Sequence, residues 1–207
     1  MYARTTTIKG DPRAMDEGIA HVTDVVWPTL EHMSGCVGLS MLADREDGRS
    51  IITAAWATEE AMRASAESVR ELRRGAAEAL RADTVDVTEY EIAILHRAHA
   101  AGDGACARVV WAEMPEGRLD SMVETFRMTM MSRMEELPGF CSMSMLIDRP
   151  MNRSVVSVTY ADHGAMARAR EQGQAMRADL DQATGSHVTE IAEFDLVLAH
   201  LRVPEMA

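Results

Sequence analysis

The feature that most constrains the fold of this chain is an internal repeat. Aligning the sequence with itself at an offset of 104 positions pairs residues 3–97 with residues 107–201 without a gap, and 20 of the 95 pairs are identical. The segment SMLADREDGRS, which starts at Ser40, matches SMLIDRPMNRS, which starts at Ser144. A gapless match of this length indicates two fused copies of one folding unit. We therefore expect domains at 1–98 and 107–207, joined by a linker at 99–106 that is rich in Gly and Ala.

Both copies show the same predicted order of strands and helices. Stretches rich in β-branched residues predict strands, and apolar residues at helical spacing predict helices. In the first copy these elements are strand, helix, strand, strand, helix and strand, at 3–8, 15–33, 37–43, 50–57, 62–80 and 85–95. The order β-α-β-β-α-β is that of a ferredoxin-like unit. Pro28 lies inside the first helix and has Ser132 as its counterpart, so we expect a kink or an early distortion there in the first copy.

Composition and charge exclude several classes of function. Apolar residues make up 47% of the chain, which is enough to build a core, and the net charge is −12. An acidic chain is a poor match for nucleic acid or for an anionic membrane, and no apolar run approaches the ~18 residues of a membrane span. The chain has three cysteines without metal-ligand spacing. We expect no metal, no nucleic-acid partner, no membrane attachment and a cytoplasmic location.

Two short motifs resemble the antibiotic biosynthesis monooxygenase (ABM) domains of the dimeric α+β barrel superfamily. They are Pro138-Gly139-Phe140 before a predicted strand, and Trp56-Ala57-Thr58-Glu59-Glu60-Ala61 at the end of another. Members of the superfamily usually pair as homodimers whose two sheets close one barrel. The resemblance implies an α+β fold in which the two ferredoxin-like copies form this barrel within one chain, as a pseudo-dimer. Whether the chain also forms homo-oligomers stays open.

The resemblance implies two activities: cofactor-free oxygenation of polyphenol-like molecules to quinones, and haem degradation. Haem-degrading members use an Asn, a Trp and a His, and neither copy keeps them; the aligned pairs are Thr7 and Trp111, Ser65 and Ala169, and Arg74 and Ala178. Quinone-forming members place a Trp and an Asn on the third strand, which Trp56 matches and Ile52 does not. We therefore expect a cofactor-free monooxygenase acting on an apolar aromatic molecule. The alternative is a non-catalytic ligand-binding or assembly protein of the same fold.

The candidate ligand site lies between the sheet and the helices of each copy. Trp56 and Tyr160 end equivalent strands, and we expect them on its wall; their alternative role is an aromatic core plug. Small residues at Ser65 and Ala169 face the sheet, and Trp111 fills space in the second copy. No residue is assigned a catalytic role.

Several charged residues recur at equivalent positions of the two copies. Glu89 and Glu91, and their counterparts Glu193 and Asp195, alternate onto one face of the last strands, where we expect them to pair with Arg4 and Arg108 of a neighbouring strand. The alternative is a pair of carboxylates that transfers protons. The arginines of the strand-connecting turns are expected to pair with the adjacent acids, Arg45 with Asp44 and Arg149 with Asp148. His96 and His200 end the last strand of each copy, where a hydrogen-bonded structural role is expected over an acid–base role.

Overall fold

The computed structural model describes residues 1–201, and its first half has the predicted order of elements. This half contains four strands and two helical regions in the order β-α-β-β-α-β, and each helical region is divided into short segments. The elements are β1 (Tyr2–Lys9), η1 (Pro12–Ala14), α1 (Met15–His21), η2 (Val22–Val26), α2 (Trp27–Leu30), β2 (Cys36–Asp44), β3 (Arg49–Trp56), α3 (Glu59–Ala64), α4 (Ala66–Ala79) and β4 (Thr84–Arg97).

The second half repeats this order after residues 98–105, which form neither helix nor strand. Its elements are β5 (Cys106–Glu113), α5 (Leu119–Thr125), η3 (Phe126–Met130), α6 (Met131–Glu135), β6 (Phe140–Asp148), β7 (Arg153–Tyr160), α7 (His163–Arg168), α8 (Arg170–Thr184) and β8 (His187–Leu201). Each half is therefore a β-α-β-β-α-β unit, as the repeat predicts.

The long last strand of each copy is shared between two compact units. Among the described residues, one unit contains Met1–Tyr90 and 195–201, and the other contains Glu91–Phe194. The second half of β4 thus pairs with β6, and the second half of β8 pairs with β2, both antiparallel. The strand order is closed, β1-β3-β2-β8-β5-β7-β6-β4. This order confirms the predicted α+β fold of two ferredoxin-like copies, whereas the domain limits at 98 and 107 stay a prediction.

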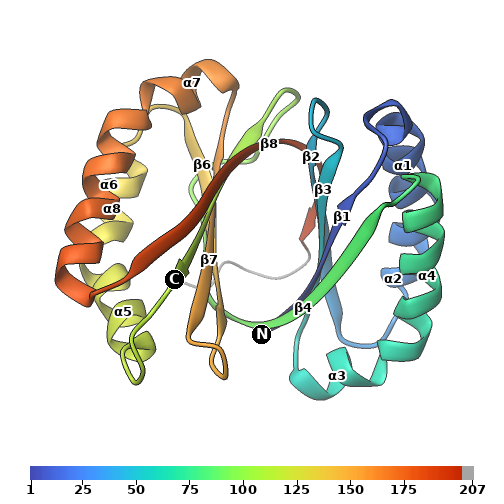
Figure 1. The fold of residues 1–207 in the computed structure, drawn as a ribbon, viewed down its shortest axis with the longest axis horizontal. Coiled ribbons are helices and arrows are strands. Elements are labelled where there is room, and N and C mark those ends of the chain that lie inside the picture. Colours follow the sequence, from blue (N-terminus) through green and yellow to red (C-terminus); the bar gives the residue numbers. More distant parts are fainter. Residues whose placement is uncertain (202–207) are drawn as a thin grey trace. The chain divides into compact units, whose positions relative to one another are not determined.

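Helices cover one face of the sheet in each unit, and the core lies between them (Figure 1). In the first unit the core includes Trp56, which is fully buried. In the second unit it includes Tyr160 at the equivalent position and several methionines. Within residues 1–201, no helix is long and apolar enough to cross a membrane.

The first helical region is distorted in both units. A turn of π-helix occupies Val22–Val26, directly before Trp27 and Pro28, where a distortion is expected. The equivalent turn in the second unit, Phe126–Met130, is also π-helical, although Ser132 stands in place of Pro28. The distortion therefore belongs to both copies and forms with or without a proline.

The predicted second helix is also divided in each unit. It breaks at Ser65 in the first unit and at Ala169 in the second, and each residue ends one short helix and precedes the next. The break matters for the site. In each unit, a buried arginine of the first strand donates a hydrogen bond to a backbone carbonyl group beside the break.

The predicted ion pairs are confirmed for Glu89 and Glu193 and are wrong for Glu91, for Asp195 and for the turn arginines. Arg4 pairs with Glu89 and Arg108 with Glu193, with closest N–O distances of 2.7 Å. The turn arginines instead contact acids far along the chain. Arg45 binds Asp16 and Asp195, and Arg149 binds Asp120 and Glu91. Asp44 and Asp148 are used locally, since their carboxylates accept backbone N–H groups of the turns.

Replacing Trp56 by Ala tests its role as a core residue. The side chain is fully buried, so we expect Trp56→Ala to lower the free energy of unfolding by about 3–5 kcal/mol. Denaturant unfolding followed by circular dichroism measures this change. Trp111→Ala is the matched control and should cost less, because Trp111 is only partly buried. Equal losses in the two variants would contradict the assignment of Trp56 to the core.

Candidate functional site

The second unit contains an apolar cavity of about 70 Å³ between its helices and its sheet. Strands β5 and β7 supply the floor through residues that alternate onto the helical face, and α5, η3, α6 and α8 supply the opposite wall. Tyr160 ends β7 and lines the cavity, as the sequence predicts. Gly173 of helix α8 also lines it, and the absence of a side chain there keeps this part of the wall open.

Methionine dominates the lining of this cavity. Six methionines contribute to it, namely Met114, Met122, Met130, Met134, Met145 and Met176. An unbranched thioether side chain has several rotatable bonds and is polarisable, so it adapts to ligands of different shape and contacts aromatic rings favourably. The cavity is therefore both apolar and adaptable.

The guanidinium of Arg108 on β5 is one of the few polar groups in this apolar wall. The Arg108 side chain is only 4% exposed. Its Nε and Nη2 atoms donate to the Glu193 carboxylate at 3.0 and 2.7 Å, and Nη2 also donates to the carbonyl oxygen of Met166 at 3.1 Å. Its Nη1 atom is buried and has no hydrogen-bond partner among the described residues. A buried N–H group without a partner is rare and costly.

Tyr160 and Arg177 surround this guanidinium. The Arg108 guanidinium lies 5.8 Å from the centre of the Tyr160 ring. Burial raises the pKa of the Tyr160 phenol. The charges of Arg108 and Arg177 oppose that rise, as does a side-chain interaction of the phenol with Arg108. Burial lowers the pKa of Arg177, and the nearby charge of Arg108 lowers it further. The polar end of the cavity is therefore positively charged and poorly hydrated, which favours a negatively charged or electron-rich oxygen.

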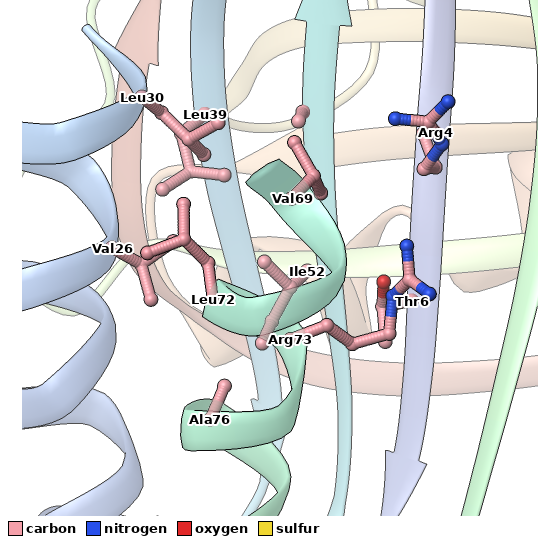
Figure 2. Close-up of a pocket in the computed structure, with 11 residues that line it drawn as sticks. Arg4, Thr6, Val26, Leu30, Leu39, Ile52, Val69, Leu72, Arg73 and Ala76 are labelled. Atoms are coloured by element: carbon pink, nitrogen blue, oxygen red, sulfur yellow. The ribbon is translucent and has the colours of Figure 1, made fainter. Parts of the chain in front are cut away.

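The equivalent pocket of the first unit is smaller, about 30 Å³. Figure 2 shows Arg73 reaching from helix α4 toward Thr6 of β1. Val69 lines this pocket at the position that Gly173 holds in the second unit. Arg4 is the counterpart of Arg108, but its Nη1 atom donates to the hydroxyl of Ser65 at 3.1 Å. The first unit thus has less space and a fully partnered arginine.

The remaining predicted ligand-binding residues lie outside the two cavity linings. Trp56 is buried in the core. Ser65 is buried outside the lining of the first pocket, where its hydroxyl accepts a hydrogen bond from Arg4. Ala169 is fully buried beside the second cavity but does not line it. Trp111 lies between Val110 and Ala112, which line the cavity, so strand alternation places it on the opposite face of β5.

Strand alternation predicts Arg108 only as an ion-pair partner and does not place it in the cavity wall. A usable signal exists in the alignment of the two copies. Arg4 and Arg108 are identical, but the residue that accepts from Arg4, Ser65, is replaced by Ala169. Because the arginine is the same in both copies and its acceptor is absent from the second, one of its N–H donors there is available to another partner.

No group of three or more His, Cys, Asp or Glu within residues 1–201 is arranged to hold a metal ion.

The histidines that end the last strands have structural surroundings. His96 contacts the carboxylate of Glu135 through Nε2 at 2.7 Å and stacks on Phe140 with ring centres 6.0 Å apart. His200 stacks on Trp27 with ring centres 4.6 Å apart. Neither histidine lines one of the two cavities described above.

The raised pKa of Tyr160 gives a testable pH dependence. Because burial raises this pKa, the phenol should ionise above the ordinary value of about 10. In the unfolded chain it ionises first, so the stability that Tyr160 contributes is complete below about pH 10 and is lost as pH rises further. An alkaline titration of tyrosinate absorbance should show one late step that Tyr160→Phe removes. If Tyr160→Phe instead removes an ionisation step at the ordinary tyrosine value of about 10, the raised pKa of Tyr160 is contradicted.

Comparison with known proteins gives a family match in the first unit and a similar protein over the whole chain. Residues 1–82 match the model of the antibiotic biosynthesis monooxygenase family. The chain is 45% identical over 206 residues to the uncharacterised protein Rv2557 of Mycobacterium tuberculosis, and the match covers 100% of this chain and 92% of that protein.

Two solved structures share the fold. One is a candidate monooxygenase from Lactobacillus acidophilus, with a TM-score of 0.70, 12% identity, and coverage of 97% of this chain and 96% of the other. The second is an anthrone oxidase-like protein, with a TM-score of 0.63, 11% identity, and coverage of 100% and 95%. At these identities the likeness establishes the fold alone. The chain therefore belongs to the family of the mycobacterial protein Rv2557, and its first 82 residues form an ABM domain.

Proposed function

We propose that this protein is a cofactor-free monooxygenase that oxidises an apolar aromatic molecule in the cavity of the second unit. The observation that carries the proposal is the methionine-lined cavity with a positively charged end. Ligand sites are mostly apolar with a few placed polar groups, and this cavity has that character. The ABM match and the anthrone oxidase-like structural neighbour agree with the proposed class of reaction.

The reaction needs no external reductant when the substrate supplies the electrons. For anthrone, one molecule of O₂ converts the CH₂ group to a carbonyl group, and the second oxygen atom leaves as water with the two substrate hydrogens. The four electrons that O₂ accepts all come from the substrate. Ionisation of the substrate makes it a better electron donor, and the charges of Arg108 and Arg177 favour the ionised form.

The cavity has to widen to accept such a substrate. Its volume of about 70 Å³ is smaller than the cavity of about 150 Å³ that holds benzene in an engineered protein. The six methionines of the lining provide the means, because they change rotamer without breaking hydrogen bonds. We therefore propose that binding rearranges the methionines on helices α5 and α8 and in the π-helical turn η3.

A second candidate function is storage or transport of an apolar ligand without chemistry. The composition of the lining supports this second function, because the lining contains a single carboxylate, that of Asp181, and no histidine. The Asp181 carboxylate is already an acceptor for the hydroxyl of Ser186. The cavity thus holds few groups able to move a proton, and turnover distinguishes the two functions.

Anthrone oxidation under air tests the proposal. The wild-type protein, without added cofactor, should accelerate O₂ uptake and anthraquinone formation in a 1:1 ratio. Gly173→Val introduces the residue that the first unit has at this position, Val69. The added Cβ makes only ordinary contacts, the nearest being Arg177 Nη1 at 3.5 Å, so the variant should fold. Because the valine fills the cavity, it should lower the rate about tenfold or more.

Ala175→Val is the matched control, since this residue of the same helix is exposed. It should keep the wild-type rate. Ligand binding without O₂ uptake would favour the storage function instead, and equal rates in the Gly173→Val variant and the wild type would place the reaction outside this cavity.

A further inference from the structure

The geometry points to Arg108 Nη1 as the group that selects the ligand of the second unit: it donates a hydrogen bond to a hydroxyl, phenolate or enolate oxygen on an otherwise apolar aromatic molecule. This inference rests on the proposed ligand site and names the chemical class that the site accepts. It also assigns the binding role to the second unit alone. The argument depends on a difference between two copies of the same arrangement.

In the first unit the arginine has a full set of partners. Arg4 donates through Nε and Nη2 to Glu89, through Nη2 to the carbonyl oxygen of Met62, and through Nη1 to Ser65 Oγ at 3.1 Å. The Ser65 hydroxyl in turn donates to the Met62 carbonyl at 2.7 Å. The serine therefore closes the hydrogen-bond network at the point where the helix breaks.

In the second unit the same network lacks one member. Arg108 keeps the bonds to Glu193 and to the Met166 carbonyl, the counterparts of Glu89 and Met62. Ala169 stands where the serine would be, so Nη1 loses its acceptor while it stays buried. A guanidinium nitrogen left without an acceptor in an apolar wall gains a strong hydrogen bond when an oxygen reaches it.

The helix next to this nitrogen leaves room for a ligand. An ideal Cβ built on Gly173 lies 3.9 Å from Arg108 Nη1. The first unit places Val69 at that position. The second unit therefore lacks both the internal acceptor and the valine side chain near this nitrogen. Both differences lie around Arg108 Nη1, which is buried beside the cavity, so an oxygen reaches it when the lining widens.

The local charge favours an anionic oxygen over a neutral one. The Glu193 carboxylate accepts from Arg108 and from Arg170, at 2.7 and 3.3 Å. Arg177 is the second cation in the cavity lining, with Asp181 as its nearby counter-charge. A bound phenol should therefore ionise more readily than the same phenol in water.

Binding of a matched pair of probes tests this inference. The pair is 2-naphthol and 2-methylnaphthalene, which differ by a hydroxyl in place of a methyl group. Affinities are measured by fluorescence titration of the full chain under nitrogen. The wild type should bind 2-naphthol about tenfold or more tightly than 2-methylnaphthalene, because a hydrogen bond to a charged group contributes at least that difference. Bound 2-naphthol should also give the naphtholate spectrum at a lower pH than free 2-naphthol.

The decisive variant is Ala169→Ser, which copies Ser65 of the first unit. The backbone angles of the two positions are close, φ −75° and ψ −11° at Ser65 against φ −76° and ψ −4° at Ala169, so the variant should fold. The new hydroxyl should accept from Arg108 Nη1 and bring the affinity ratio of the two probes close to 1. Ala167→Ser is the matched control on the same helix, where the residue is exposed, and it should keep the wild-type ratio.

The outcomes separate this inference from the proposed function. If both probes bind the wild type with equal affinity, the apolar site stands and the role of Arg108 is overturned. If Ala169→Ser keeps the wild-type ratio, the role of Arg108 Nη1 is also overturned. If Tyr160→Phe removes the discrimination and Ala169→Ser does not, the phenol of Tyr160 is the selecting group. If neither probe binds, the ligand site and the inference both fail.

Discussion

A buried arginine on the first strand of each unit organises the rest of the structure. Arg4 and Arg108 each hold together three parts of the chain: their own strand, the last strand of the copy through a glutamate, and the broken second helix through a carbonyl group. Removing a guanidinium from water is unfavourable unless its donors find partners. The glutamate and the helix break supply them, which explains why the helix is interrupted at the same place in both units.

The two copies have diverged around this common arrangement. The first unit has a tryptophan at the end of β3, a serine at the helix break and a valine one turn later, and its pocket is about 30 Å³. The second unit has Tyr160, Ala169 and Gly173 at these positions, and its cavity is about 70 Å³. Each change removes bulk or an internal partner. The first unit is therefore closed by its own side chains, and the second keeps space and an open donor.

Much of the fold was predictable from the sequence, because it depends on features that the sequence repeats. The offset of the two copies and the apolar periodicity gave the β-α-β-β-α-β order, and strand alternation gave the pairs Arg4–Glu89 and Arg108–Glu193. The partners of Arg45 and Arg149 were not predictable in this way. They come from a helix and from a strand far along the chain, and adjacency in sequence favoured the wrong aspartates.

The site was predictable only in part, for a physical reason. Helical spacing places Ser65 and Ala169 toward the sheet, but it does not show that the helix breaks there and turns the serine toward Arg4. The π-helical turns, in contrast, occur in both units and belong to the shared fold. Distortions common to both copies therefore do not explain a cavity that is large in one of them. The difference lies in a few side chains around one guanidinium, where the lack of a hydroxyl and of an isopropyl group leaves a buried donor without an internal acceptor beside the cavity.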